Sequence, residues 1–318
     1  MFPDREEPAL AFGPVPSRRL GRSLGINNVP PKTCSYSCIY CQLGRTPRLE
    51  TTRATFHDPD EIVRAVSDRV ARGAEAIDAL TFVPDGEPTL DLGLGEEISR
   101  LRTTGKRVAV ISNASLLWRT DVRDDLIRAD WVSVKVDAAD AETWRRMNRP
   151  HRRLDFHTVL NGLVRFAEAY DGVLTTETML VAGVNTHDEH LRKVAALLGR
   201  LNPEIAYVAS PIRPPAESWV GIPEERKFVA AYTSIGAYVR QVEFLTGDEG
   251  EGFALSGGVE RSLLDITAVH PMRAGAVEDL LSRGGESWSL IERLVSEGRL
   301  IELVHCGTTY YMRKIPGR

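Results

Sequence analysis

Residues 30–41 read Pro30-Pro31-Lys32-Thr33-Cys34-Ser35-Tyr36-Ser37-Cys38-Ile39-Tyr40-Cys41 and hold three of the four cysteines of this 318-residue chain. The three cysteines follow a Cys-x3-Cys-x2-Cys spacing. Thiolates this close together can reach one metal centre, and the loop between them can wrap around it. The residues alone leave two interpretations, an iron–sulfur cluster or a zinc site.

The number of cysteines in the triplet favours the iron–sulfur cluster. Three thiolates leave one iron of a cubane cluster without a protein ligand, and that iron can bind a substrate or cofactor. A structural zinc ion takes a fourth protein ligand. His57 and Cys306 are candidates by residue type, but neither stands at ligand spacing from the triplet. A zinc-binding loop remains the alternative.

The triplet, with Tyr40 directly before its last cysteine, resembles that of the radical S-adenosylmethionine (radical SAM) superfamily. Its flanks, residues 13–26 and 41–46, are similar to the branch related to the archaeal tRNA wyosine-base synthases. The resemblance implies a [4Fe–4S] cluster on Cys34, Cys38 and Cys41, with SAM chelated to the fourth iron. It also implies an external electron donor, such as a flavodoxin or ferredoxin, and a 5′-deoxyadenosyl radical that abstracts hydrogen from a substrate.

The substrate is less well defined by the sequence. Wyosine-type synthases carry extra cysteines for a second cluster, whereas this chain has only Cys306 to spare. This difference argues against tricyclic-base synthesis on tRNA. RNA, a peptide or protein side chain, and a small metabolite stay open as substrate classes.

Composition, charge and the small number of cysteines favour a reduced, cytoplasmic, soluble protein. With 42% hydrophobic residues, the chain is long enough for one large domain and a small one. A formal charge of −4 gives no general attraction to nucleic acid or to anionic membranes. No apolar run is long enough to span a bilayer, and the acidic N-terminus lacks the apolar core of a secretory signal.

Short apolar segments alternate with helical patterns over most of the chain. They predict strands at residues 24–29, 79–83, 107–111, 131–136, 173–181 and 205–209. Repeated strand–helix units imply parallel strands with right-handed crossovers. The predicted fold class is therefore α/β, an open, partial (β/α)6 barrel, which the resemblance also implies. Residues 1–23 show no periodicity and are expected to form an irregular lead-in.

The pattern changes at Gly257-Gly258, which predicts a boundary between a barrel of residues 1–256 and an accessory domain of residues 257–318. Three helical segments and a hairpin predict a small winged-helix-like domain. Residues 258–318 hold eight acidic and eight basic side chains, and the third helical segment is acidic. Duplex DNA binding depends on neutralising phosphates, so we expect this domain to pack on the barrel or to bind a peptide or protein. A non-catalytic winged-helix nucleic-acid-binding regulator is the rival class.

Polar residues at the predicted strand ends are candidates for binding SAM. Gly86 and Glu87, in Asp85-Gly86-Glu87-Pro88-Thr89, resemble the family segment that binds the SAM amino group, although Asp85 replaces its first glycine. A simple turn is the alternative.

Three further residues lie at the ends of the next two strands. Asn113 ends the third strand, and Lys135 and Asp137 share one face of the fourth. The resemblance implies that these residues, with Tyr40, contact SAM, while an internal Lys–Asp or Lys–Glu pair is the alternative.

Glu177 and Arg213 are the candidates for catalytic residues. Glu177 lies in the fifth strand and is expected to contact substrate or SAM, or else to form a satisfied ion pair. Arg213 follows the sixth strand, where it can bind a substrate carboxylate or phosphate in a bidentate way. A rigid proline-rich turn with an exposed arginine is the alternative.

Overall fold

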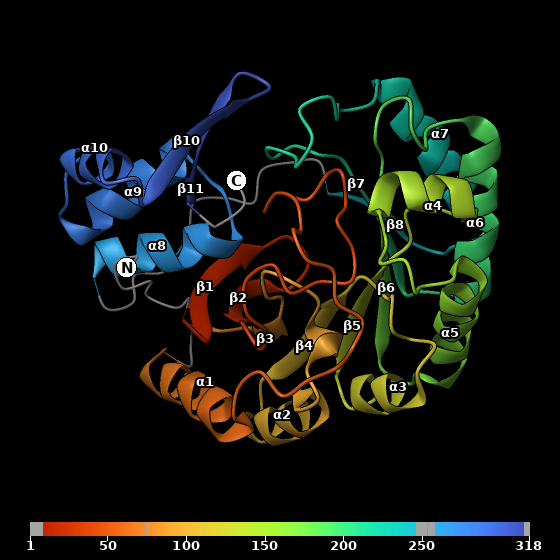
Figure 1. The fold of residues 1–318 in the computed structure, drawn as a ribbon, viewed down its shortest axis with the longest axis horizontal. Coiled ribbons are helices and arrows are strands. Elements are labelled where there is room, and N and C mark those ends of the chain that lie inside the picture. Colours follow the sequence, from red (N-terminus) through yellow and green to blue (C-terminus); the bar gives the residue numbers. More distant parts are fainter. Residues whose placement is uncertain (1–8, 74–75, 246–252, 254–257, 315–318) are drawn as a thin grey trace.

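The main body of the molecule is an eight-stranded, curled sheet surrounded by helices (Figure 1). The computed structural model describes residues 9–73, 76–245, 253 and 258–314. From β2 to β8 all neighbouring strands are parallel, whereas β1 is antiparallel to β2. The α/β fold class and the partial barrel are thus confirmed. The strands are β1 (Ala11–Ser17), β2 (Gly21–Ile26), β3 (Ala79–Phe82), β4 (Arg107–Ser112), β5 (Trp131–Lys135), β6 (Val173–Met179), β7 (Ile205–Ala209) and β8 (Val242–Leu245).

The crossover helices cover the outer face of this sheet (Figure 1). The first of them begins where the sequence predicts, because the Asp58 side chain accepts a hydrogen bond from the Asp60 amide at 2.9 Å and Pro59 takes the first helical position. The helices are α1 (Pro59–Gly73), α2 (Leu94–Leu101), α3 (Thr120–Leu126), α4 (Ala141–Asn148), α5 (Phe156–Ala169), α6 (Asp188–Leu201) and α7 (Glu225–Gly236).

Three elements differ from the prediction. The expected irregular lead-in is wrong, since residues 11–17 form β1. Its prolines hid the strand, but proline is compatible with the edge of a sheet, where an unpaired amide is not needed. The short strand β8 and the helix α4 were also not predicted. Helix α4 begins at Asp140, whose carboxylate accepts a hydrogen bond from the Thr143 amide at 2.8 Å.

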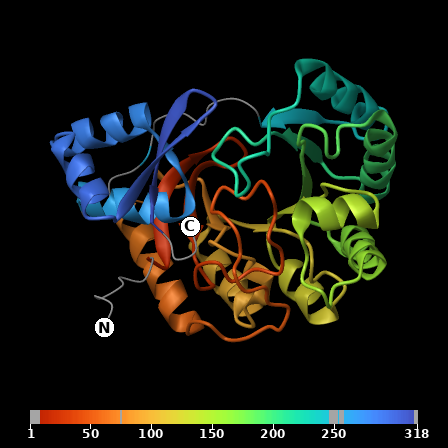
Figure 2. The same cartoon turned by 45° about the horizontal axis from the view of Figure 1, so that its top comes forward.

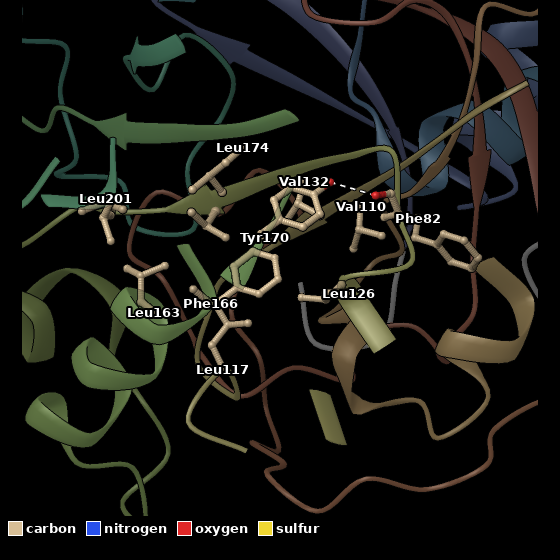
Figure 3. Packing of buried hydrophobic residues seen from close by; sticks show 14 of the residues in the cluster. Phe82, Val110, Leu117, Leu126, Val132, Leu163, Phe166, Tyr170, Leu174 and Leu201 are labelled. Atoms are coloured by element: carbon tan, nitrogen blue, oxygen red, sulfur yellow. Dashed lines mark hydrogen bonds between the residues drawn. The ribbon is translucent and has the colours of Figure 1, made fainter. Parts of the chain in front are cut away.

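The main hydrophobic core lies between the sheet and the outer helices (Figure 3). Phe82, Val110 and Val132 come from three adjacent strands and are fully buried. Leu126 and Phe166 meet them from α3 and α5. Burial of each such side chain contributes about 1.5–3 kcal/mol, so this layer fixes the strands and the loops that follow them.

The turn between β1 and β2 closes the barrel at the amino ends of its parallel strands. Leu20 packs in a cluster that includes Trp131 and Tyr207. The guanidinium of Arg19 lies 5.9 Å from the ring centroid of Trp131 and 5.8 Å from that of Tyr207. The opposite end, at the carboxyl ends of the strands, carries the cysteine loop.

The described C-terminal residues form a smaller unit with its own core (Figure 2). The three predicted helices and the hairpin are present, and a short strand adds to the hairpin in the order β10-β11-β9. The predicted boundary at residues 256/257 lies outside the described residues. The elements are α8 (Val259–Val269), β9 (Met272–Arg273), α9 (Ala274–Gly284), α10 (Ser289–Ser296), β10 (Leu300–His305) and β11 (Thr308–Arg313).

Helix α8 joins this unit to the barrel, because Ala268 and Val269 pack on Phe12 of β1. Packing on the barrel was one of the two expectations for the C-terminal residues. Within the described part of the chain, no helix has the length and apolar character needed to cross a membrane.

Candidate active site at the cysteine loop

The cysteine loop is held against the segment that follows β3. The Thr33 carbonyl accepts a hydrogen bond from the Glu87 amide at 2.9 Å, and the Lys32 amide donates to the Asp85 carbonyl at 2.6 Å. A Cβ atom on Gly86 would lie 2.1 Å from the Thr33 carbonyl oxygen. Only glycine therefore allows the two backbones to approach this closely.

Amide groups surround the first two cysteine sulfurs. The Asn113 Nδ2 atom lies 3.5 Å from Cys34 Sγ, and the Asn148 Nδ2 atom lies 3.5 Å from Cys38 Sγ. The backbone amide of Tyr36 donates to Cys34 Sγ at 3.5 Å as well. N–H donors stabilise thiolates and cluster sulfurs, so this environment suits metal-bound cysteine.

A buried lysine lies beside the third cysteine. The Lys32 Nζ atom is 3.9 Å from Cys41 Sγ, donates to the Gly44 carbonyl at 2.9 Å and is 3.8 Å from a carboxylate oxygen of Asp85. It therefore ties the end of the cysteine loop to the segment after β3. Lys32 was not predicted as a site residue, because a lysine near a cysteine forms no distinctive pattern.

Burial disfavours free thiolates at this site. Burial, with a smaller effect of the Glu87 carboxylate, raises the pKa of Cys34 well above its usual value. Burial also raises the pKa of Cys38 to about 12, and the nearby Asp137 adds to this effect. Thiolates here need a positively charged centre, which an iron–sulfur cluster provides. The residues thus fit such a cluster.

No three His, Cys, Asp or Glu side chains of the described residues lie close enough to hold a single metal ion. A cubane cluster does not require this arrangement, because each of its thiolate ligands binds a different iron.

Glu87 is buried and fully engaged by the protein. Its carboxylate accepts hydrogen bonds from the Ser112 hydroxyl at 2.7 Å, the Asn113 amide at 2.7 Å and the Thr89 hydroxyl at 2.6 Å. Burial raises the pKa of Glu87 despite these donors. The Glu87 side chain therefore fixes the position of Asn113, and its contact with SAM stays a prediction.

Tyr40, Asp137 and Asn148 form a second buried group. Asp137 accepts hydrogen bonds from the Tyr40 hydroxyl, from the Asn148 side chain at 2.8 Å and from the Met179 amide at 2.8 Å. Asn148 thus links Asp137 to Cys38. It ends helix α4, which the sequence did not reveal, and so it was missed as a site residue.

Lys135 and Glu177 meet inside the barrel. Glu177 pairs with Lys135 through one carboxylate oxygen and with Arg19 through the other, the latter at 2.5 Å. Burial alone would raise the pKa of Glu177, but the two cations lower it to about 2. The Lys–Glu pair that was left open as an alternative is therefore present. A contact of Glu177 with substrate or SAM stays a prediction.

A cavity of about 30 Å³ lies beside the cysteine loop. Asn113, Lys135 and Asp137 line it together with Tyr36 and Asn148. The structure therefore brings three of the predicted cofactor-binding residues to one place, where Asn113 follows β4 and Lys135 and Asp137 stand at the end of β5.

Arg213 lies at the junction with the C-terminal residues. Its guanidinium donates to the Gln42 side chain at 2.6 Å and lies 3.2 Å from His270 Nε2. Gln42 in turn donates to the Val269 carbonyl at 3.0 Å. Glu177 instead pairs with Lys135 and Arg19 inside the barrel, so the two predicted catalytic residues have different partners.

An open barrel of parallel strands, with three cysteines and buried polar side chains at the carboxyl ends, defines a class of enzymes that bind a cofactor at that end. Residues 28–197 match the radical SAM superfamily. The chain belongs to this superfamily, and its cofactors are accordingly a [4Fe–4S] cluster and SAM. Enzymes of this kind generally need a reductant.

Several proteins are similar to this chain. UPF0026 protein MJ1312 of Methanocaldococcus jannaschii is 43% identical over 313 residues, which cover 97% of both chains. A UPF0026 protein of Helicobacter pylori strain 26695 is 34% identical over 62% of this chain and 65% of its own. Among solved structures, TYW1 with a lysine-pyruvate adduct bound has a TM-score of 0.52 and 17% identity, over 69% of this chain and 74% of that one. This last likeness shows a shared fold.

Proposed function

We propose that the enzyme reductively cleaves SAM at a [4Fe–4S] cluster on Cys34, Cys38 and Cys41, and that the resulting 5′-deoxyadenosyl radical abstracts hydrogen from a substrate. One observation carries the proposal: Asn113, Lys135 and Asp137 gather at the carboxyl ends of β4 and β5, and the Asn113 Nδ2 atom lies 3.5 Å from Cys34 Sγ. SAM presents an ammonium, a carboxylate and ribose hydroxyls, and these side chains offer partners for each of these groups.

In this proposal the chain's own residues orient and protect the cofactors. Asn113 and Asn148 donate to the cysteine sulfurs, and Glu87 holds Asn113 in position. The backbone around Gly86 contacts the ammonium group of SAM, as the resemblance to the family segment implies. Tyr40 closes the space beside Asp137 and limits access of water to the reacting groups.

We place substrate entry at the mouth of the barrel, next to the C-terminal residues. Arg213, Gln42 and His270 meet there. The substrate belongs to one of the three classes that the sequence leaves open: RNA, a peptide or protein side chain, or a small metabolite. We propose the cytoplasm as the site of the reaction, because thiols stay reduced in that compartment.

The test is anaerobic purification followed by incubation with SAM and dithionite. We expect about four irons per chain, a brown colour and formation of 5′-deoxyadenosine. Replacement of Cys34, Cys38 or Cys41 by alanine should remove both the iron and the product. Cys306→Ala is the matched control, because Cys306 is exposed in the turn between β10 and β11. A colourless, zinc-containing protein would refute the proposal and support the zinc-loop alternative.

A further inference from the structure

An arginine-rich segment runs beside the cysteine loop. Residues 145–153 carry five arginines: Arg145, Arg146, Arg149, Arg152 and Arg153. All of these except Arg149 are exposed, and those four form no ion pair with the described residues. In a chain with a formal charge of −4, this is a local concentration of positive charge. We call residues 145–153 the arginine segment.

The acidic side chains nearest in sequence do not neutralise the arginine segment directly. Asp140 accepts a hydrogen bond from the Thr143 amide at the start of α4, and Asp155 accepts one from the Thr158 amide at the start of α5. Glu142 is exposed, but it supplies only one negative charge against the four exposed arginines. The segment therefore keeps a positive potential.

The arginine segment is bonded to the cysteine loop along its length. The Met147 carbonyl accepts from the Ile39 amide at 2.9 Å, and the Asn148 carbonyl accepts from the Ser37 amide at 3.0 Å. The His151 amide donates to the Ser35 carbonyl at 2.9 Å. With the Asn148 side chain 3.5 Å from Cys38 Sγ, few bonds separate this surface from a proposed cluster ligand.

A shared carboxylate fixes the segment to the rest of the loop. Glu217 accepts two hydrogen bonds from Arg45, both at 2.7 Å, and also pairs with Arg149. Arg45 keeps 64% of its side chain exposed, and because Arg45 and Arg149 share the single carboxylate of Glu217, the three side chains together carry a net positive charge.

The C-terminal residues approach the cysteine loop from elsewhere. They meet it at Gln42, and Figures 1 and 2 show α4 on the opposite side of the barrel from α8. The arginine segment is thus left open to a partner that does not need the proposed substrate entry.

We propose that the arginine segment is the docking site for an acidic one-electron carrier protein, a flavodoxin or a ferredoxin. This inference rests on the proposed function, which requires one electron from outside. The carrier loses one electron and the oxidised cluster gains it, with no atom transferred. Complementary charge steers the two proteins together, and docking here brings the carrier to the Cys38 side of the cluster.

An electron carrier fits this surface better than a nucleic acid does. Single-stranded nucleic acids are bound by exposed aromatic rings on which bases stack. The aromatic residues that flank the segment, Trp144 and Phe156, are only 5% and 6% exposed. The segment also lies against Cys38, a proposed ligand of the cluster. Electron transfer needs such a short path to the cluster, whereas phosphate binding does not.

The test compares two charge-reversed variants of the full-length, reconstituted enzyme, R145E/R146E and R152E/R153E. R64E/R192E is the matched control, since Arg64 and Arg192 are exposed on α1 and α6 and form no ion pair with the described residues. Calorimetry would measure binding of an acidic flavodoxin and an acidic ferredoxin at low and at physiological ionic strength. Stopped-flow absorbance would measure reduction of the cluster by each donor.

We expect both segment variants to bind the donors at least about tenfold more weakly, with a smaller salt dependence, and to be reduced more slowly. The control should bind like the unmodified enzyme. With dithionite in excess as the reductant, all variants should form 5′-deoxyadenosine at the same rate.

Several results would overturn the inference. These are unchanged donor binding in both segment variants, an equal loss in the control, or no binding of either donor to the unmodified enzyme. Loss of affinity for bulk tRNA with donor binding retained would assign the surface to nucleic acid instead. Failure of the proposed function would look different from failure of this inference. It would appear as absence of 5′-deoxyadenosine with dithionite, whereas donor binding is measured separately.

Discussion

Asn148 places its side-chain amide 3.5 Å from the sulfur of Cys38. A hydrogen bond to a cluster ligand favours the reduced, more negative state and so raises the reduction potential. In Asn148→Leu we expect the potential of the cluster to fall by about 40 mV, the equivalent of about 1 kcal/mol for one electron. A redox titration followed by electron paramagnetic resonance would measure it. Asn161→Leu, at an exposed position on α5, is the control; equal potentials in both variants would contradict the assignment.

Glu177→Gln should destabilise the protein by about 3–5 kcal/mol, because Lys135 and Arg19 would then face a neutral group inside the barrel. Denaturant unfolding of the iron-free chain measures this. Glu189→Gln is the control, since the Glu189–Lys193 pair on α6 is exposed and screened by solvent, so its loss should change the stability far less. Equal stability of the two variants would show that the carboxylate does not stabilise the barrel interior.

Gly86→Ala should cost about 1–3 kcal/mol and reduce the iron content, because the new methyl group collides with the Thr33 carbonyl. Unfolding curves and iron analysis would report the two effects. At Gly73, the end of α1, a Cβ has open space around it, so Gly73→Ala should be neutral or slightly stabilising. Full iron content and unchanged stability in Gly86→Ala would show that the loop can shift.

Glu97 on α2 gives the stability a pH dependence. Burial, followed by the neighbouring Asp91, raises the pKa of Glu97 from 4.5 to about 9. The folded state then binds a proton that the unfolded state releases, so the free energy of unfolding falls as the pH rises from about 4.5 to about 9. The slope is up to about 1.4 kcal/mol per pH unit.

Glu97→Gln should remove this slope, as measured by denaturant unfolding between pH 5 and pH 9. Glu96→Gln is the control, because Glu96 is exposed and pairs with Arg100 on the surface. The same slope in Glu97→Gln as in the unmodified chain would place its cause elsewhere.

Arg213→Met should loosen the junction between the barrel and the C-terminal residues, because two contacts, to Gln42 and His270, are lost together. Hydrogen exchange should rise in residues 210–213 and at the end of α8. Arg240→Met, at an exposed position after α7, is the control. Unchanged exchange combined with loss of SAM cleavage would instead support the catalytic role that the sequence suggested for Arg213.

Much of the barrel was predictable because its strands are short apolar segments between helices, which is a local pattern. The start of the first helix is also local, since the Asp58 side chain caps it and Pro59 takes its first position. Strand β1 was missed because its prolines resemble those of a loop, and its pairing with β2 is a tertiary effect.

The site was predictable only where a motif carried it. The three cysteines are such a motif, whereas the SAM contacts of Asn113, Lys135 and Asp137 came from the family resemblance and stay predictions. Partners far apart in sequence gave no local signal. Arg19 lies 158 residues from Glu177, and only the closed end of the barrel brings the two together.

The packing of α8 on β1 has a consequence for biosynthesis. The ribosome makes β1 long before Ala268 and Val269, which cover Phe12. Until then the nascent chain exposes an apolar ring and the free edge of a strand, both of which favour aggregation. A chain that stops before α8 would therefore be a substrate for chaperones and proteases, and the cell would receive no smaller working enzyme from it.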